Sequence, residues 1–352
     1  MIQKASEAGI LTRQELVSMI PPLLLDIKKS DLVLDMCAAP GSKTGEMIEL
    51  MNMDCEGDEE PTGAVVANDM DLKRAYMLTH QIKRINRGGM AVINHEGQKI
   101  PSIVDKEGKE VKFDKILVDV PCSGDGAIRK LPARWRFWST SDGISLHRVQ
   151  MQLFRRAIEL CKVGGKVVYS TCSLNPIENE AVITAVLKMA EDTCPGAIQM
   201  LDTHALIPNV QGRKGLHSWF VAQSKKNGPF KTSEEEHSFD ELFTTYPEYS
   251  DELHVSTDGV IKNTMFPLPK EEMEKLGIEK SMRIMPHDQN TGGFFIAVFN
   301  KTKEFTFPDI HLSNKEKRRI EDQERAAKRK AESKIEKQKL REAKGLPPKL
   351  DR

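Results

Sequence analysis

Apolar runs that end in polar turns recur along the first 190 residues of this 352-residue chain. They are DLVLDMC (31–37), GAVVANDM (63–70), GMAVINHEG (89–97), FDKILVDVP (113–121) and GGKVVYSTCS (164–173). Helical patterns such as 71–86 and 144–162 separate them. Apolar strands separated by helices predict an α/β fold with a mostly parallel sheet and helices on both faces.

The rest of the chain divides by composition. We expect a lead-in segment at 1–30, a core at 31–195, and an irregular insertion at 196–300 that ends in the strand FFIAVF and completes the core. Residues 301–352 form a basic tail with few large apolar side chains, which indicates a solvated helix or a disordered segment.

Bulk properties exclude several classes of protein. The chain has no apolar signal region, no apolar run of membrane-spanning length and no CxxC pair, so we expect reduced thiols, no membrane span and no metal site. The net charge is zero, but residues 315–344 carry 13 Lys or Arg against 7 Asp or Glu. Contact with an anionic partner must therefore come from local patches or from the tail.

Two cysteines end apolar strands beside a serine. Cys122 lies in ILVDVPCSGDG and Cys172 in YSTCSLNPIENE. Ligands of parallel sheets bind at the carboxyl ends of the strands, so both thiols are candidates for one site. The alternatives are two buried, unreactive cysteines or a redox disulfide between them. The same inert role is expected of three other cysteines, namely Cys55, Cys161 and Cys194.

The first strand leads through small residues into a helix, LDMCAAPGSKT (34–44). Small residues let backbone N–H groups approach a ligand. A phosphate-binding P-loop is excluded because Ser42 separates Gly41 from Lys43, and no GxGxxG dinucleotide motif is present. The loop therefore indicates a ligand that needs close backbone contact but is not a nucleotide with a long phosphate chain.

Acidic residues follow the next three strands, at Asp69, Glu96 and Asp119. Carboxylates at these positions can accept hydrogen bonds from ribose hydroxyls or from an adenine edge. Each could instead cap a helix. Their recurrence favours a nucleoside cofactor.

Together, LDMCAAPGSKT, ANDMDLKR, DVPCSGDG and VVYSTCSLNPIENEAVI resemble the Sun-domain RNA (cytosine-5) methyltransferases, and most closely their eukaryotic tRNA branch. The likeness extends over roughly residues 12–299. It implies a class I S-adenosylmethionine-dependent methyltransferase fold. The implied activity is methylation of carbon 5 of cytosine in RNA, most typically tRNA, through a covalent cysteine–cytosine adduct.

The resemblance also implies roles for single residues. Cys172 would be the nucleophile, and Cys122 would help to release the product. Apart from the resemblance, Asp119 is placed to hydrogen-bond the ring nitrogen N3 if its carboxyl is neutral or shares a proton. We also hypothesise that Lys43 and the N-terminus of the helix that follows favour the thiolate of Cys172. The residues expected to bind S-adenosylmethionine are Cys37, Ala38, Ala39, Pro40, Gly41, Ser42, Lys43, Asp69, Glu96 and Asp119, of which Glu96 stands where the family usually has Asp.

The expected partner is RNA, bound by a monomer. Relatives usually carry an N-terminal RNA-binding region, so we expect residues 1–30 to be its remnant in a truncated chain. The stretch IRKLPARWRFW (128–138) interleaves basic and aromatic residues next to Cys122, which is typical of phosphate contact and base stacking. The alternative is aromatic packing beneath solvated arginines. Weaker candidates are 212–220 and 286–295.

The tail segments KRR (317–319) and AAKRK (326–330) indicate either nuclear import and RNA attraction or a merely solvated helix. They predict a protein of the nucleus or nucleolus, with the cytoplasm as a further location. Two other functions stay open: the same chemistry on ribosomal or messenger RNA, and a non-catalytic RNA-binding role.

Overall fold

The computed structural model describes residues 14–53, 55–56, 59–85, 88–223, 241–245 and 261–308. The chain divides into two compact units, Met1–Phe307 and Pro308–Arg352. The first 13 residues of the lead-in segment and the basic segments 317–319 and 326–330 lie outside the described residues.

A nine-stranded sheet forms the centre of the first unit, in the order β3-β2-β1-β6-β7-β13-β12-β9, with β8 paired to β13. The strands from β3 to β7 are parallel neighbours, and β13, β12, β9 and β8 are antiparallel additions. Their bounds are β1 Leu32–Asp35, β2 Ala64–Asn68, β3 Met90–Ile93, β6 Phe113–Asp119, β7 Cys161–Thr171, β8 Ile198–Leu201, β9 Arg213–Lys214, β12 Met282–Ile284 and β13 Phe294–Lys301.

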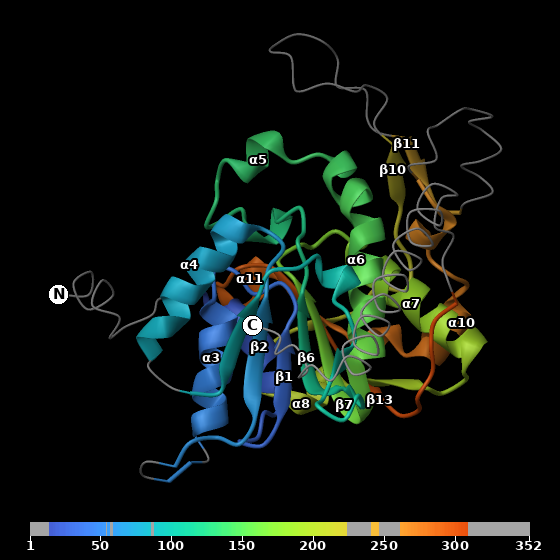
Figure 1. The fold of residues 1–352 in the computed structure, drawn as a ribbon. Coiled ribbons are helices and arrows are strands. Elements are labelled where there is room, and N and C mark those ends of the chain that lie inside the picture. Colours follow the sequence, from blue (N-terminus) through green and yellow to red (C-terminus); the bar gives the residue numbers. More distant parts are fainter. Residues whose placement is uncertain are drawn as a thin grey trace, which may run out of the picture. The chain divides into compact units, whose positions relative to one another are not determined.

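Helices cover both faces of this sheet, which confirms the predicted architecture (Figure 1). One face carries α2, α3 and α4, and the other carries α6 and α7. The helices are α2 Ile20–Leu24, α3 Ser42–Asn52, α4 Leu72–Ile82, α5 Arg134–Phe137, α6 Thr140–Leu160, α7 Glu180–Thr193, α8 Thr203–Leu206, α10 Lys270–Leu276 and α11 Pro286–Gln289.

Smaller elements complete the described chain. Two-stranded sheets pair β4 with β5 and β10 with β11. These strands are β4 Ile103–Val104, β5 Glu110–Val111, β10 Val221–Gln223 and β11 Glu241–Phe243. The 3-10 turns are Leu16–Met19, Lys83–Ile85, Gly97–Lys99, Asp125–Ala127, Asn263–Met265 and Ile278–Lys280. Among the residues described, no helix has the length and apolar character needed to cross a membrane.

Two apolar layers fill the space between sheet and helices. Side chains alternate along a strand, so Ile116 and Val118 of β6 pack toward α6 and α7, whereas Leu117 between them packs toward α2, α3 and α4. The same alternation separates Tyr169 from Val168 in β7. All five side chains are 0% exposed. Burial on both faces explains why these strands are continuous apolar runs.

Capping residues set the helix boundaries that apolar spacing alone placed only roughly. Helix α6 begins four residues before the predicted position 144, because Ser139 and Asp142 form a capping box at its start. Helix α4 begins after Asp71, whose side chain accepts from Arg74 N at 2.9 Å. A 3-10 turn at Lys83–Ile85 continues it to the end of the predicted segment.

A buried ion pair joins α7 to β12. Arg283 donates from Nη1 to both carboxylate oxygens of Glu180 at 2.7 Å, and the two side chains are 8% and 0% exposed. Arg283→Met leaves the carboxylate buried without its partner, so we expect the free energy of unfolding to fall by about 3–5 kcal/mol, measured by urea titration with tryptophan fluorescence.

The neighbouring strand offers a matched control. Arg213 pairs with Arg283 in the sheet register, but its ion pair with Asp288 is 55% exposed on the arginine side. We expect Arg213→Met to cost about 0–1 kcal/mol. Similar small losses for both variants would contradict a stabilising role for the buried pair.

Candidate active site

Strands β6 and β7 bring the two predicted cysteines together. The strands are parallel neighbours with Asp119 opposite Ser170, so the loops that follow them leave the same edge of the sheet. The Sγ atoms of Cys122 and Cys172 are 3.3 Å apart. Both cysteines are free and half-buried, so the disulfide alternative does not hold in this structure.

Close backbone contacts hold the two loops against each other. Gly126 N–H donates to the carbonyl of Cys172 at 3.0 Å, and Gly293 N–H donates to the carbonyl of Gly126 at 2.8 Å. A Cβ atom at Gly126 would lie 2.6 Å from the Gly293 oxygen and 2.7 Å from the Cys172 oxygen. Only glycine permits this approach, which joins three segments far apart in sequence.

An ion pair lies at the same edge. Lys43 Nζ is 2.7 Å from Asp119 Oδ2, and Asp119 Oδ1 accepts from the hydroxyl of Ser170 at 2.7 Å. Burial lowers the pKa of Lys43, but the charge of Asp119 and its hydrogen bond outweigh burial and raise that pKa overall. Lys43 therefore stays a cation beside the thiols.

The two thiols have unequal acidity. The hydrogen bond from Cys122 lowers the pKa of Cys172; burial opposes this, and the charge of Lys43 supports it. The same hydrogen bond raises the pKa of Cys122, and burial and nearby negative charge add to the effect. The arrangement favours a thiolate on Cys172 that accepts from a neutral Cys122. By contrast, burial raises the pKa of Cys161 to about 12, as expected of an inert cysteine.

The loop predicted to bind a cofactor lies between β1 and α3. Gly41 has a φ of 110°, a left-handed conformation that favours glycine, and α3 begins at the next residue. Asp69 accepts from Ala39 N at 3.2 Å and from Asp71 N at 3.0 Å. Asp69 thus holds the loop to the start of α4, but the residue that caps α4 is Asp71, and the Asp69 carboxylate still has lone pairs for a ligand.

The remaining predicted cofactor residues are placed less closely. Cys37 is half-buried, and burial raises its pKa, so it is not a second reactive thiol. Glu96 lies at the same edge, but its side chain is 46% exposed and pairs with Lys99 at 2.8 Å. The structure therefore pairs Lys43 with Asp119 and Cys122 with Cys172 at one edge of the sheet, and the charges of the first pair act on Cys172, whereas the carboxylate of Glu96 pairs with Lys99.

One observation tests whether this loop suits S-adenosylmethionine. The buried carboxyl of Asp35 accepts from Thr44 through Oδ2, whereas its Oδ1 has no hydrogen-bond partner in the described part of the chain. An unpaired acceptor beside small residues and further carboxylates fits a ligand with hydroxyl and amino donors. Within the described ranges, no group of three or more His, Cys, Asp or Glu side chains is arranged to hold a metal ion.

The basic and aromatic stretch after Cys122 separates into two kinds of residue. Trp138 is half-buried and donates from Nε1 to Ser123 Oγ at 2.9 Å, as the packing alternative predicts. Trp135 and Phe137, on α5, are 77% and 76% exposed. The guanidinium of Arg134 lies beside Gly124 and hence near Cys172.

Sequence reasoning missed a buried carboxylate, Glu178. It is 0% exposed and accepts hydrogen bonds from Ser123 and Ser173, the residues that follow the two cysteines. Its neighbours Asn179 and Glu180 are equally buried. The signal was three successive polar residues, 178–180, separated from the TCS motif by four residues, and this pattern resembles an ordinary helix start.

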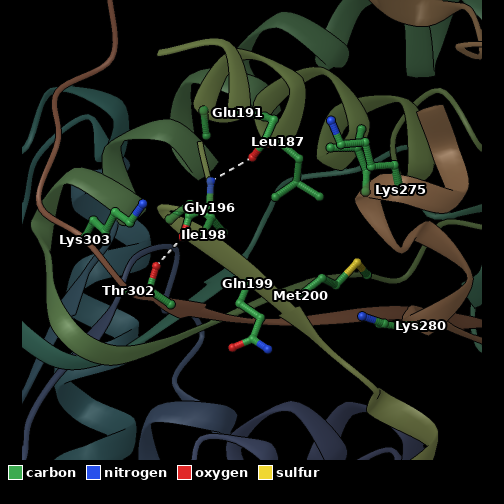
Figure 2. Close-up of a pocket in the computed structure, with 12 residues that line it drawn as sticks. Leu187, Glu191, Gly196, Ile198, Gln199, Met200, Lys275, Lys280, Thr302 and Lys303 are labelled. Carbon is green, nitrogen blue, oxygen red and sulfur yellow. Dashed lines mark hydrogen bonds between the residues drawn. The ribbon is translucent and has the colours of Figure 1, made fainter. Parts of the chain in front are cut away.

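A pocket of about 460 Å³ lies elsewhere, among β8, α7 and α10 (Figure 2). Its polar groups bond to one another: Gly196 N–H donates to Glu191 at 2.8 Å, and Thr302 donates to the carbonyl of Gly196. No residue that the sequence predicted for a site lines this pocket. The candidate site is therefore the thiol pair and the cofactor loop beside it.

Known methyltransferases are similar to this chain over much of its length. The family model of the 16S rRNA methyltransferase RsmB/F matches residues 22–231, more than half of the chain. A tRNA (cytosine(34)-C(5))-methyltransferase of Drosophila melanogaster is 44% identical over 304 residues, which are 85% of this chain and 38% of the relative. A multisite-specific tRNA:(cytosine-C(5))-methyltransferase of Saccharomyces cerevisiae is 41% identical, over 85% of this chain and 40% of the relative.

This chain thus spans about two fifths of the length of these relatives. Among solved structures, a methyltransferase homologue of Pyrococcus horikoshii has a TM-score of 0.53 and 27% identity, covering 84% of this chain and 69% of its own. NSun6 of the same organism with SFG has a TM-score of 0.54 at 24% identity, covering 85% and 55%, which shows the fold alone.

The fold is that of the class I S-adenosylmethionine-dependent methyltransferases, as the resemblance implied. The family model and the identities lead to one conclusion, and it agrees with the two cysteine motifs. The chain belongs to the RsmB/F family of methyltransferases, the Sun-domain family.

Proposed function

We propose that this chain methylates carbon 5 of cytosine in tRNA, with S-adenosylmethionine as methyl donor. The observation that carries the proposal is the contact of two free thiols at 3.3 Å, one with a lowered and one with a raised pKa. Relatives named as tRNA cytosine methyltransferases support the substrate, and the neighbour with SFG, an analogue of S-adenosylmethionine, supports the cofactor.

The thiolate of Cys172 would supply covalent catalysis. Its Sγ forms a bond to carbon 6 of the ring, the C5–C6 π electrons move toward carbon 5, and carbon 5 becomes nucleophilic. Asp119, the partner of Lys43, would accept a hydrogen bond from N3 of the same ring once that nitrogen carries a proton. S-adenosylmethionine supplies an electrophilic methyl group, and the loop Cys37–Lys43 with Asp69 would hold it.

Cys122 would complete the turnover. Once Cys172 is a thioether, it no longer accepts the hydrogen bond that chiefly raises the pKa of Cys122. Cys122 can then lose its proton to solvent, and its thiolate takes the proton from carbon 5. The C5–H electrons re-form the double bond, and the C6–S bond breaks with its electron pair returning to Cys172. Two thiols in contact suit these steps because Cys172 adds to carbon 6 and Cys122 removes the proton from carbon 5 that allows the adduct to break down.

The RNA strand would enter over α5, which lies beyond the strand ends in Figure 1. A cytosine must leave its stack to reach a half-buried thiol. Trp135 and Phe137 present exposed rings, with Arg134 and Arg136 on the same short helix. Exposed rings beside guanidinium groups suit stacking of flanking bases and contact with phosphates.

Other parts of the proposal have narrower support. The same chemistry on ribosomal or messenger RNA needs no different residues in this site, and a non-catalytic RNA-binding role is disfavoured by the presence of both cysteine motifs. Location in the nucleus or nucleolus, with the cytoplasm as a further site, rests on the basic segments 317–319 and 326–330. The monomeric state stays a prediction.

Activation of Cys172 can be tested without RNA. We expect site-resolved alkylation by iodoacetamide, followed by mass spectrometry across pH, to give Cys172 a midpoint below the ordinary thiol value of about 8.5. Lys43→Met should raise that midpoint because it removes the nearby positive charge. Lys166→Met, which alters a half-buried lysine in the middle of β7, is the control and should leave it unchanged. An ordinary midpoint that Lys43→Met does not move would contradict the activation.

Substitution of the two cysteines should block the reaction at different steps. Cys172→Ala should lower the rate of methyl transfer to a cytosine-containing tRNA at least about a thousandfold, while S-adenosylmethionine still binds. Cys122→Ala should accumulate protein–RNA adducts that survive denaturing electrophoresis, because the adduct forms but is not released. Robust turnover by Cys172→Ala would refute its assignment as the nucleophile.

Loss of stacking should weaken RNA binding. We expect Trp135→Ala combined with Phe137→Ala to raise the dissociation constant for tRNA by about 5- to 150-fold, the equivalent of about 1–3 kcal/mol, in a filter-binding assay. Met53→Ala removes an equally exposed side chain just beyond the far end of α3 and should leave binding unchanged. Equal affinities for both variants would remove α5 from the proposed RNA path.

A further inference from the structure

Two chemically identical thiols in contact leave open what makes one the nucleophile. The buried carboxylate of Glu178 lies behind both cysteine loops. It is not one of the residues that the sequence motifs single out for chemistry. Its hydrogen bonds help to hold the two sulfur atoms at 3.3 Å, and its charge affects the acidity of the two thiols unequally.

Glu178 accepts hydrogen bonds from the loop of each cysteine. Its Oε1 accepts from Ser123 N at 2.7 Å and from Gln150 Nε2 at 3.1 Å. Its Oε2 accepts from the hydroxyls of Ser123 at 2.5 Å and Ser173 at 2.8 Å. Since Ser123 follows Cys122 and Ser173 follows Cys172, one carboxylate ties the two loops together from the protein interior.

The donors are themselves fixed in direction. Trp138 Nε1 donates to Ser123 Oγ, so the hydroxyl hydrogen of Ser123 must point to Glu178. The backbone N–H of Asn175 donates to Ser173 Oγ, which directs that hydroxyl to the carboxylate in the same way. The backbone carbonyl of Glu178 accepts from the hydroxyl of buried Tyr169 at 2.6 Å. An acceptor surrounded by directed donors is poorly replaced by a group that itself donates.

The charges around the two sulfurs are unequal. Besides each other, Cys122 faces the carboxylates of Glu178 and Asp119, whereas Cys172 faces Lys43, Asp119 and Asp125. Asp119 acts on both thiols and does not distinguish them. Among these groups, Glu178 disfavours a thiolate at Cys122, whereas at Cys172 Lys43 favours a thiolate and Asp125 opposes it.

We propose that Glu178 is a positioning residue that holds the two cysteine loops together and keeps the shared proton on Cys122, so that Cys172 is the nucleophile. The role of Cys172 as nucleophile rests on the proposed function, but the protonation of the two thiols is a property of the protein without RNA. In that state Cys122 keeps its proton and donates it in a hydrogen bond to the thiolate of Cys172, and the proton released from Cys172 goes to solvent.

The test is Glu178→Gln, which keeps the shape but removes the charge and turns one acceptor atom into a donor. We expect the alkylation midpoint of Cys172 to rise and that of Cys122 to fall, measured by site-resolved iodoacetamide labelling across pH. A relative shift of about one pKa unit lowers the Cys172 to Cys122 labelling ratio near neutral pH about tenfold. An unchanged ratio overturns the proposal, even if thermal stability falls.

Glu159→Gln is the matched control, since it makes the same exchange at a half-buried carboxylate near the end of α6 that pairs with Arg156. It should leave the ratio unchanged. If Glu178→Gln does not fold, Ser173→Ala removes one donor from the carboxylate and should lower the ratio less but in the same direction; no change there also overturns the proposal.

The labelling needs neither RNA nor methyl donor, so it separates this inference from the proposed function. Absence of methyl transfer by the unaltered protein would overturn the function and leave the labelling result standing. A labelling ratio that Glu178→Gln does not change would overturn the positioning role and leave the function standing.

Discussion

The parallel pairing of β6 with β7 is the constraint on which the site depends. Because Asp119 lies opposite Ser170, the loops that carry Cys122 and Cys172 begin side by side. Strand spacing of about 4.8 Å brings the loops near each other but does not by itself place two sulfur atoms in contact. The 3.3 Å separation needs the further contacts that the loops make with each other and with the protein interior.

Those contacts come from segments that the chain order separates widely. Gly126 reaches the carbonyl of Cys172, and Gly293, at the start of the antiparallel strand β13, closes the other side. Glu178 then joins the loops from beneath. The late strand therefore does more than extend the sheet, because the residue directly before it bonds to the loop that carries Cys122.

Unequal charge around equal thiols is what allows a division of chemical roles. Lys43 is held as a cation by Asp119, and it lies on the side of Cys172. Glu178 bonds to the loops of both cysteines, and its charge raises the pKa of Cys122. Burial acts to raise the pKa of both Cys122 and Cys172, so ionisation of either requires a compensating donor or charge, and Cys172 receives both, from Cys122 and Lys43.

The sequence alone determined the parallel half of the sheet, the position of the late strand and the edge at which both cysteines emerge, because strand periodicity and strand ends are local properties. Helix starts were placed less well, since the Ser139–Asp142 cap depends on a few polar atoms rather than on apolar spacing. Three features were decided only by the tertiary structure: the contact between the two sulfur atoms, the pairing of Glu96 with Lys99, and the burial of Glu178. A carboxylate that starts a helix looks the same in sequence whether water or two cysteine loops surround it, and only packing determines which donors reach it.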